Sequence, residues 1–269
     1  MQIGIVLAGG KGTRFKSKKT NKTIAEFHGK PLVKYGTDLL SKSCDKVVVV
    51  VGFNGQGVIK AVHDDPKILF AHQKVRLGTG HATRIGVQKM MEKGFKPEKV
   101  FVGYGDHMMF YTPKNLIDLS NALKNVDEVV SMITCDHEDP DTTFWGRIVR
   151  NKEGYVEAIV EQKVATPEQR NIKELNVSLY CFRYDFLTNF IGKIKRNITS
   201  KEFYLTDMIE IAVKEGKKAV AVKVPFENVG IGINSKEELV VSAELFKKKK
   251  HKSKFNTEVD FTQQDYLTD

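Results

Sequence analysis

A glycine-rich loop with basic side chains lies near the start of the chain. The sequence LAGGKGTRF follows a short apolar run directly. Glycines allow positive φ and let backbone N–H groups approach an anion closely, while Lys11 and Arg14 add charge suited to a polyphosphate. The loop matches neither GxxxxGK[ST] nor GxGxxG, so neither common phosphate-loop motif applies. A glycine-rich turn without a ligand stays an alternative at this point.

A second segment combines an amide side chain with the start of a predicted helix. It contains Gln73, followed by LGTGHA from Leu77. The glutamine amide carries both a donor and an acceptor, which suits the imide edge of uracil. Thr79 and Gly80 lead into a helix whose N-terminus favours anions. A capped helix start without a ligand is the alternative.

A carboxylate, Asp106, follows a buried apolar run that ends in YGD. Open α/β sheets place ligands at the carboxyl ends of their strands, and an aspartate there can hold a divalent cation. A turn or helix-capping role is the alternative for Asp106. We expect the next residue, His107, to lie at the surface or behind the site rather than to bind a ligand.

These residues must be positioned by alternating strands and helices. Strands are predicted at 3–7, 46–51, 99–104 and 129–134, and helices at 30–40, 81–93 and 115–123. This order predicts an α/β fold with a mostly parallel sheet and helices on both sides.

The pattern changes after about residue 140. Short strands at 147–150, 155–161 and 177–182 predict a small β-rich lobe or an antiparallel edge over roughly 140–184. Helices at 185–194 and 206–215 and a strand at 220–224 follow. Ser235 and Glu238 form a capping-box pattern that opens a last helix to about Phe246. We expect a domain over 1–246 and a basic, then polar, poorly ordered tail over 247–269.

Composition limits the class of protein. The 269 residues are 41% hydrophobic and 28% charged, which is typical of a globular chain. No apolar run reaches the ~18 residues of a membrane span, and the start lacks a basic leader. The three widely spaced cysteines indicate reduced thiols and a cytoplasmic location. The net charge of +10 suggests an anionic partner: nucleic acid, a membrane surface or a phosphorylated small molecule.

Taken together, the motifs resemble the sugar-1-phosphate nucleotidyltransferases. LAGGKGTRF, the Asn21-Lys22-Thr23 segment and the GKPL segment from Gly29 are similar to the opening of those enzymes, although proline usually stands where this chain has Asn21. The Gln73 segment resembles the Q-x(3)-LGTGHA segment of the uridylyltransferase domain of bifunctional N-acetylglucosamine-1-phosphate uridylyltransferases. The resemblance covers roughly residues 1–245 and implies a Rossmann-like sheet with a small β-rich sugar-binding lobe.

The resemblance also implies roles on the nucleotide side. Arg14 and Lys22 would be the catalytic cations around the phosphates, and Asp106 and Asn234 would hold Mg²⁺. UTP would be the nucleotide, because Gln73 and Gly78 would pair with the uracil. The implied nucleotide-binding residues are Leu7, Ala8, Gly9, Gly10, Lys11, Gly12, Gln73, Gly78 and Thr79.

On the acceptor side, the segments FWGRIVR, IVEQK, ELNVSLY and EFYLTD resemble the family's GYGRIVR, IVE-x-K, E-x-N-T-G-x-Y and EYYLTD. The residues implied to bind the sugar phosphate are Tyr104, Gly146, Glu161, Asn176 and Thr206. Asn176 would face a 2-acetamido group, which an amide can bond through both its donor and its acceptor. The chain departs from the family at Val177 and Ser178, where Thr-Gly is usual, so another acceptor stays open.

The sequence therefore predicts a Mg²⁺-dependent transfer of a uridylyl group from UTP to an N-acetylhexosamine 1-phosphate. Transfer to glucose 1-phosphate and an inactive nucleotide-binding protein are the alternatives. No acetyltransferase domain of hexapeptide repeats is expected in this chain. Six lysines lie between 247 and 254, so the rest of the chain carries +4. No RNA-binding or helix-turn-helix pattern accompanies them, so we expect neither nucleic acid nor a membrane as partner.

Overall fold

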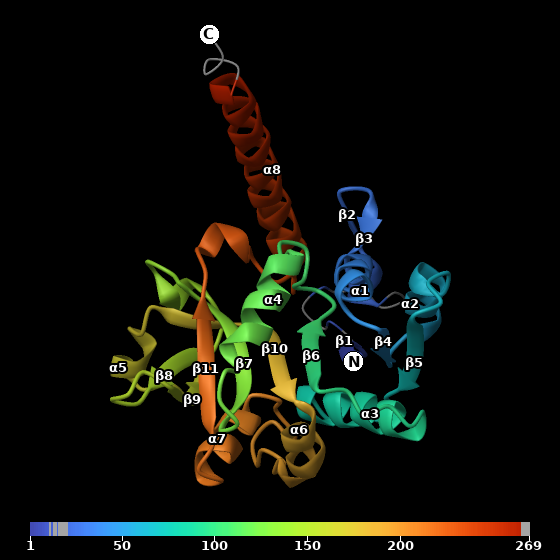
Figure 1. The fold of residues 1–269 in the computed structure, drawn as a ribbon. Helices are drawn as coiled ribbons and strands as arrows, with labels where there is room; N and C mark the ends of the chain where they lie inside the picture. Colours follow the sequence, from blue (N-terminus) through green and yellow to red (C-terminus); the bar gives the residue numbers. More distant parts are fainter. Residues whose placement is uncertain (11, 13–14, 16–20, 265–269) are drawn as a thin grey trace.

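The computed structural model describes residues 1–10, 12, 15 and 21–264, with side chains described up to Lys250. In this part of the chain, a nine-stranded sheet forms the centre of the molecule (Figure 1). Its strands, in spatial order, are β5 (Ile68–His72), β4 (Lys46–Val51), β1 (Gln2–Ala8), β6 (Lys99–Tyr104), β10 (Glu174–Arg183), β7 (Glu128–Asp136), β11 (Lys218–Lys223), β9 (Val156–Val160) and β8 (Arg147–Arg150). β5, β4, β1 and β6 are parallel neighbours, and β11 is parallel to β7. The predicted mostly parallel α/β sheet is confirmed.

Helices cover both faces of this sheet. The alternation of side chains along β4 shows why, because Val48 and Val50 enter one core and Val47, Val49 and Val51 the other. The helices that pack in the first core are α3 (Thr79–Glu92), α6 (Tyr184–Phe190) and α7 (Asp207–Lys214). Those in the second core are α1 (Leu32–Ser43), α2 (Gly55–Val62) and α4 (Pro113–Ala122). The β-branched run of β4 is therefore buried on both sides.

The β-rich segment is divided between two places. β8 and β9 form an antiparallel hairpin at the edge of the sheet. β10 instead runs through the middle of the sheet, antiparallel to both β6 and β7. Its apolar residues are buried on both faces, which is why it occupies a central position. A short helix, α5 (Pro167–Arg170), lies between β9 and β10 in the chain, and a small hairpin of β2 (Glu26–Phe27) and β3 (Lys30–Pro31) precedes α1.

The last helix, α8, runs over Lys236–Gln264 and projects away from the sheet (Figure 1). The predicted capping box is confirmed, because the Glu238 amide donates to Ser235 Oγ at 3.1 Å and the Ser235 amide donates to Glu238 Oε2 at 2.9 Å. The helix passes the expected end at Phe246 and includes most of the segment expected to be a poorly ordered tail. No glycine or proline interrupts 236–264, and lysine is a good helix former. Phe246 fixes the helix to the body through ring contacts with Phe27 and Phe110.

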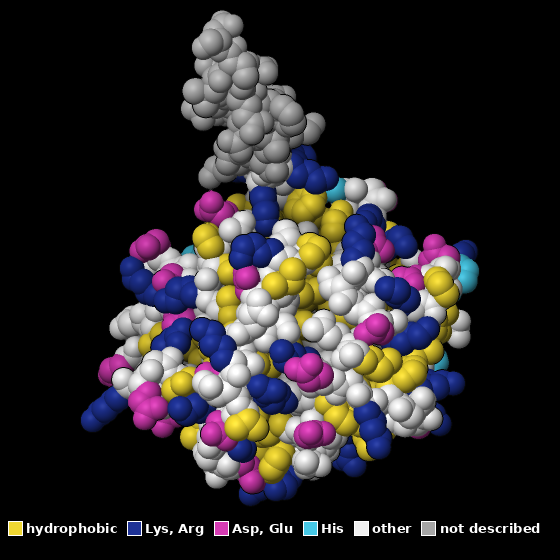
Figure 2. Space-filling view, in the orientation of Figure 1, with side chains coloured by type: hydrophobic (Ala, Val, Ile, Leu, Met, Phe, Trp, Pro, Cys, Tyr) yellow, Lys and Arg dark blue, Asp and Glu magenta, His cyan; other side chains and the backbone are white. Residues whose placement is uncertain are grey.

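The surface has charged side chains of both signs, and the cysteines lie in the interior. Lys and Arg side chains are spread over the face shown in Figure 2 and are interspersed with Asp and Glu. The three cysteines are buried as free thiols. Within the described residues, no helix has the length and apolar character needed to cross a membrane.

Candidate active site

A cavity of about 470 Å³ opens at the carboxyl ends of β1 and β6. It is lined by the predicted catalytic residue Lys22 and by most of the residues predicted to bind a nucleotide: Leu7, Gly9, Gly10, Gly12, Gln73, Gly78 and Thr79. Ala8 lies behind the wall, 1% exposed. Lys11 and Arg14 lie outside the described residues. The position agrees with the rule that open α/β sheets bind ligands at the carboxyl ends of their strands.

Asn21 fixes the segment that carries Lys22. Its side-chain Nδ2 donates to the carbonyl oxygens of Ala8 and Phe53, both at 2.8 Å, and its Oδ1 accepts from the Thr23 amide and hydroxyl, both at 2.9 Å. Asn21 is 1% exposed and caps η2 (Lys22–Ile24), a 3₁₀ helix of one turn. The asparagine therefore ties the end of β1 to this turn, and the lysine that follows it is held at the cavity wall.

Lys22 lies between the two predicted metal ligands. Its Nζ forms an ion pair with Asp106 Oδ2 and donates a hydrogen bond to Asn234 Oδ1 at 3.0 Å. Asp106 follows β6, whereas Asn234 precedes α8, so the fold joins residues that are far apart in the sequence. The side chains of Lys22 and Asp106 are only 10% and 19% exposed, so their charges interact in a partly desolvated setting.

The oxygens around Lys22 Nζ fit a magnesium ion by their chemistry. The Asp106 carboxylate oxygen and the Asn234 amide oxygen both contact the same positive group, the ammonium of Lys22. Mg²⁺ binds oxygen ligands and is commonly held by one or two carboxylates together with waters and substrate phosphates. No cluster of three or more His, Cys, Asp or Glu side chains suited to a metal occurs in the described part of the chain. With two protein ligands, waters or phosphate oxygens of a substrate would fill the remaining positions around such an ion.

The Gln73 side chain is held at the floor of the cavity. Its Nε2 lies 3.2 Å from the Gly78 carbonyl oxygen and 3.1 Å from His81 Nδ1, and the residue is 5% exposed. Gly78 has φ of 95°, a conformation that favours glycine. The loop is fastened to the chain before α7, because the Phe203 amide donates to the Leu77 carbonyl at 2.7 Å. The amide that is predicted to pair with uracil is thus already oriented by the loop.

Replacing Gly78 with alanine tests this loop. An added Cβ would lie 2.5 Å from the Phe203 carbonyl oxygen, so both strain and a clash displace the backbone. We expect KM for UTP, the nucleotide that the sequence predicts, to rise about tenfold and the free energy of unfolding to fall by about 2 kcal/mol. The matched control is Gly94→Ala, because Gly94 has φ of 71° but open space around its Cβ position. Steady-state kinetics that show equal UTP affinity for both variants would contradict a role of the Gly78 loop in binding.

A second cavity of about 220 Å³ adjoins the first. Its walls include the predicted acceptor residues Gly146, Glu161, Asn176 and Thr206. Four residues line both cavities: Thr79, Tyr104, Asp106 and Asn234. The predicted nucleotide and sugar-phosphate sites therefore meet at the Lys22–Asp106–Asn234 cluster.

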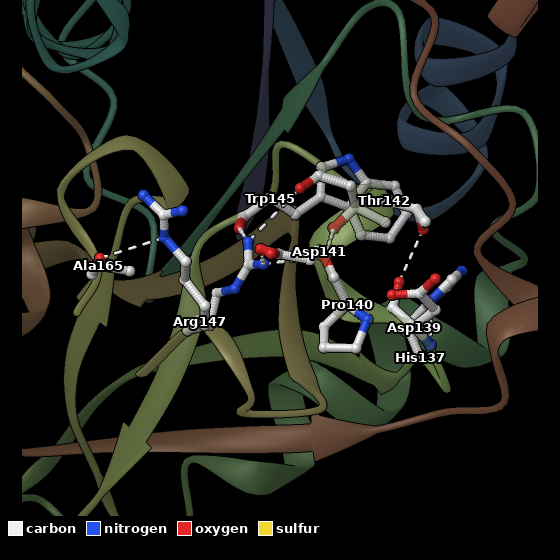
Figure 3. Close-up of polar contacts among 10 residues, drawn as sticks. His137, Asp139, Pro140, Asp141, Thr142, Trp145, Arg147 and Ala165 are labelled. Carbon is white, nitrogen blue, oxygen red and sulfur yellow. Dashed lines mark hydrogen bonds and ion pairs between the residues drawn. The ribbon is translucent and has the colours of Figure 1, made fainter. Parts of the chain in front are cut away.

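A buried arginine, Arg147, holds the loop that contains Trp145 through hydrogen bonds (Figure 3). Arg147 is 0% exposed, and its guanidinium donates to the carbonyl oxygens of Trp145 at 2.7 Å and Pro140 at 2.9 Å and to Asp141 Oδ1 at 3.1 Å. Burial lowers the pKa of Arg147, and the Asp141 carboxylate opposes that shift. These bonds close the loop that places Trp145 and Gly146 against the cavity. Arg147 is a positioning residue that the sequence pattern did not identify.

The acidic groups at the second cavity interact with each other. Burial raises the pKa of Glu161, and the negative charge of Asp207 raises it further, while Lys163 and a hydrogen bond from Thr206 oppose the shift. Burial, followed by the charge of Glu210, raises the pKa of Asp207 to about 6. Since Asp207 begins α7, the helix N-terminus offsets part of the cost of its charge.

Asp207→Asn should therefore change the pH dependence of stability. The raised folded-state pKa means that the charged carboxylate destabilises the fold above pH about 6. The variant is expected to be more stable than the wild type by about 1 kcal/mol at pH 8, with the difference vanishing near pH 4. Denaturant titrations at both pH values measure it, and Asp185→Asn in the first turn of α6 is the control. A stability difference that does not depend on pH would show that the buried charge of Asp207 is not its cause.

Several cavity residues were not among the predicted site residues. Arg76 and Glu202 line the first cavity, and Trp145 and Ser178 line the second. Arg76 directly precedes LGTGHA, so its position in the sequence could have identified it as a residue of the cavity wall. The expectation that His107 lies at the surface or behind the site is wrong, because His107 is 4% exposed and lines the second cavity, with its ring centroid 5.1 Å from that of Trp145. Burial lowers the pKa of His107 to about 4, so it packs as a neutral ring.

Comparisons with known proteins place the chain in a family. The family model described as Nucleotidyl transferase matches residues 3–230. The chain is 37% identical over 247 residues to the bifunctional protein GlmU of Acetivibrio thermocellus. The aligned residues cover 91% of this chain and 51% of that protein. It is also 37% identical over 255 residues to GlmU of Caldicellulosiruptor saccharolyticus, covering 93% of this chain and 53% of that protein. The chain thus spans about half the length of these relatives.

Solved structures share the fold at low sequence identity. One is a Bacillus anthracis protein described as a glucose-1-phosphate thymidylyltransferase in complex with a sucrose, with a TM-score of 0.70, 16% identity, and coverage of 91% of this chain and 95% of that one. Another is a UDP-glucose pyrophosphorylase complexed with UDP-glucose, with a TM-score of 0.70, 18% identity, and coverage of 93% and 99%. At these identities the likeness establishes the fold alone.

Proposed function

The chain belongs to the nucleotidyl transferase family, and from this we propose that it is a sugar-1-phosphate nucleotidyltransferase. We propose UTP as the donor and N-acetylglucosamine 1-phosphate as the acceptor, with UDP-N-acetylglucosamine and pyrophosphate as products. Relatives that are named bifunctional GlmU support this assignment at 34–37% identity. We further propose the cytoplasm as the compartment, because nucleoside triphosphates and sugar phosphates are intracellular metabolites.

One observation carries the proposal: the two cavities meet at the Lys22–Asp106–Asn234 cluster. A cavity beside a glycine loop suits a triphosphate, and a cavity lined by hydroxyl, amide and carboxyl groups suits a sugar. A reaction between two phosphate-bearing substrates needs its positive groups at the position where they meet.

The mechanism follows from charge and geometry. An oxygen of the sugar phosphate attacks the α-phosphorus of UTP in line, the new P–O bond forms, and the bond to the pyrophosphate oxygen breaks. The nucleophile is already an anion, so no general base is required. Lys22 neutralises the α-phosphoryl oxygens, and the two cavities hold the reactants in line. Mg²⁺, held by Asp106 and Asn234, would supply further charge stabilisation at the phosphate oxygens.

A second candidate function is transfer to glucose 1-phosphate. Ser178 lies in the wall of the second cavity. Its side chain takes up room there that the glycine usual in the family would leave to the acceptor. The fold likeness to a UDP-glucose pyrophosphorylase is compatible with this candidate. An inactive nucleotide-binding protein is less well supported, since Lys22, Asp106 and Asn234 form a connected cluster.

A substrate panel tests the proposal. The full chain is incubated with Mg²⁺, each of the four ribonucleoside triphosphates and dTTP, and a set of hexose and N-acetylhexosamine 1-phosphates, and pyrophosphate release is measured. We expect UTP with N-acetylglucosamine 1-phosphate to give the highest kcat/KM. The highest kcat/KM with glucose 1-phosphate would support the second candidate, and no release from any pair would contradict nucleotidyl transfer altogether.

A further inference from the structure

The ring of His107 contacts two segments that build the second cavity. His107 lines this cavity and is 4% exposed. Its ring centroid lies 5.1 Å from that of Trp145, with an angle of 37° between the ring planes. A Cβ added at Gly232 would lie 3.0 Å from His107 Cγ, so the ring also lies against the backbone of that segment. The ring therefore contacts both the loop before β8 and the segment that leads to Asn234.

The backbone around His107 is held independently of its ring. The His107 amide donates to the Tyr104 carbonyl oxygen at 2.9 Å, and the Ile233 amide donates to the Asp106 carbonyl oxygen at 3.0 Å. These bonds fasten the turn after β6 to the end of that strand and to the segment before α8. Removing the ring should therefore leave the backbone of Asp106 in place, so that the effect of the ring on the second cavity can be measured separately.

One nitrogen of the His107 ring, Nε2, is buried and has no hydrogen-bond partner among the residues that the structure describes. A buried polar atom without a partner lowers stability, so this nitrogen does not explain why a ring occupies the position. Because protein atoms enclose Nε2, it is also out of reach of a ligand in the cavity. The contribution of His107 is therefore the flat shape of its ring, which a phenyl ring would share.

Trp145 is the residue through which the His107 ring can act on an acceptor. Trp145 lines the second cavity and directly precedes Gly146, which is predicted to bind the sugar phosphate. Its carbonyl oxygen accepts from the Arg147 guanidinium at 2.7 Å, which fixes the backbone. The indole has ring contacts with His107 and, at 6.2 Å, with Phe226. Aromatic rings about 4.5–7 Å apart attract each other, so these two neighbours hold the indole in its orientation.

We infer that His107 is a positioning residue for the acceptor: its ring holds the Trp145 indole as the wall against which the sugar lies. This inference rests on the proposed function and deepens it. The similar family segment GYGRIVR has tyrosine in place of Trp145, so the family pattern does not account for this pair of rings. Loss of the His107 ring should lower the affinity for the acceptor sugar and leave the affinity for the nucleotide unchanged.

The kinetic test compares His107→Ala with His107→Phe. In His107→Ala we expect KM for the preferred sugar 1-phosphate to rise about fivefold, with kcat and KM for UTP changed by less than about twofold. The phenyl ring of His107→Phe should bring the acceptor KM back to within about twofold of the wild-type value, because it packs as the imidazole does. His63→Ala is the control, since His63 is exposed at the end of α2 and lines neither cavity.

Two kinetic outcomes would overturn the inference. One is an acceptor KM that the phenyl ring does not restore, which would assign the role to the nitrogen atoms. The other is an equal rise in KM for UTP or in the Mg²⁺ concentration for half-maximal turnover, because the substitution would then act through Asp106. A double variant checks the partner: His107→Ala added to Trp145→Ala should raise the acceptor KM by less than about twofold further, since coupled residues are not additive.

Binding without catalysis gives an independent readout. UDP-N-acetylglucosamine and UDP-glucose would fill both cavities, whereas UDP would fill the first alone. In calorimetry, His107→Ala should bind the preferred nucleotide sugar about fivefold more weakly and UDP with less than about twofold change. Trp145 is the only tryptophan of the chain, so its emission should respond to the nucleotide sugar. Equal weakening of both ligands overturns the inference and leaves the proposed function intact, whereas a wild type that binds neither nucleotide sugar overturns both.

Discussion

Lys22→Ala is expected to lower kcat/KM by about 100- to 1,000-fold with the fold preserved. The Nζ of Lys22 lies between Asp106 and Asn234, where the two cavities meet. In the proposed reaction, negative charge develops on the α-phosphoryl oxygens, and a preorganised cation in a partly dry site stabilises it more than water does. The loss should fall mainly on kcat, because the charge develops in the transition state.

The measurement is pyrophosphate release under saturating UTP and acceptor, together with a thermal unfolding curve for each protein. Lys114→Ala is the control, since Lys114 is exposed and, among the residues that the structure describes, its ammonium pairs with Asp118 alone on the surface of α4. Its activity should match the wild type. Lys22→Arg keeps the positive charge but changes the shape of the side chain. The space beside this side chain is narrow, because a Cβ added at Gly12 would lie 2.8 Å from Lys22 Cβ. Near-normal turnover of a folded Lys22→Ala protein would remove Lys22 from the mechanism.

Much of the fold follows from local sequence patterns. The β-branched run at Lys46–Val51 and the apolar run at Lys99–Tyr104 became strands with those same bounds, because a continuous apolar run can be buried only between two helical layers. The sequence analysis did not predict α2 or β5. α2 carries two glycines in its first turn, and β5 is only partly buried, so the periodic signal is weak in both.

The site was predictable where its chemistry is carried by contiguous motifs. The glycine loop after β1, the Gln73–Thr79 segment and the YGD strand end together contain most of the residues that line the first cavity. What could not be predicted depends on tertiary contacts. The hydrogen bonds of Asn21 to Ala8 and Phe53, the burial of Arg147 and the positive φ of Ser178 arise only in the folded chain. All three lie in segments that resemble family motifs, but a motif does not show which atoms a side chain contacts or which backbone angles a residue adopts.

Removing the carboxylate of Asp106 is the second substitution for which we expect a large loss of kcat. Asp106 supplies the only carboxylate oxygen that contacts Lys22 within the described residues, and Asn234 supplies a neutral amide oxygen. Removing the aspartate should therefore leave the proposed Mg²⁺ site with one neutral protein ligand. It should also leave Lys22 without its anionic partner. Both changes act at the position where the two cavities meet, so the chemical step is affected more than the fold.

Asp106→Ala is expected to lower kcat by about 1,000-fold and to raise the Mg²⁺ concentration that supports half-maximal turnover. Titrating Mg²⁺ in the pyrophosphate assay, and measuring Mg²⁺-dependent UTP binding by calorimetry, separates metal binding from chemistry. Asn234→Ala should shift the Mg²⁺ requirement in the same direction by a smaller factor, because it removes a neutral ligand. Asp127→Ala is the control, since its carboxylate is exposed and pairs with Lys217. If Asp106→Ala kept the wild-type Mg²⁺ dependence and turnover, the ion would have to bind elsewhere, and the converging oxygens of Asp106 and Asn234 would serve only to hold Lys22.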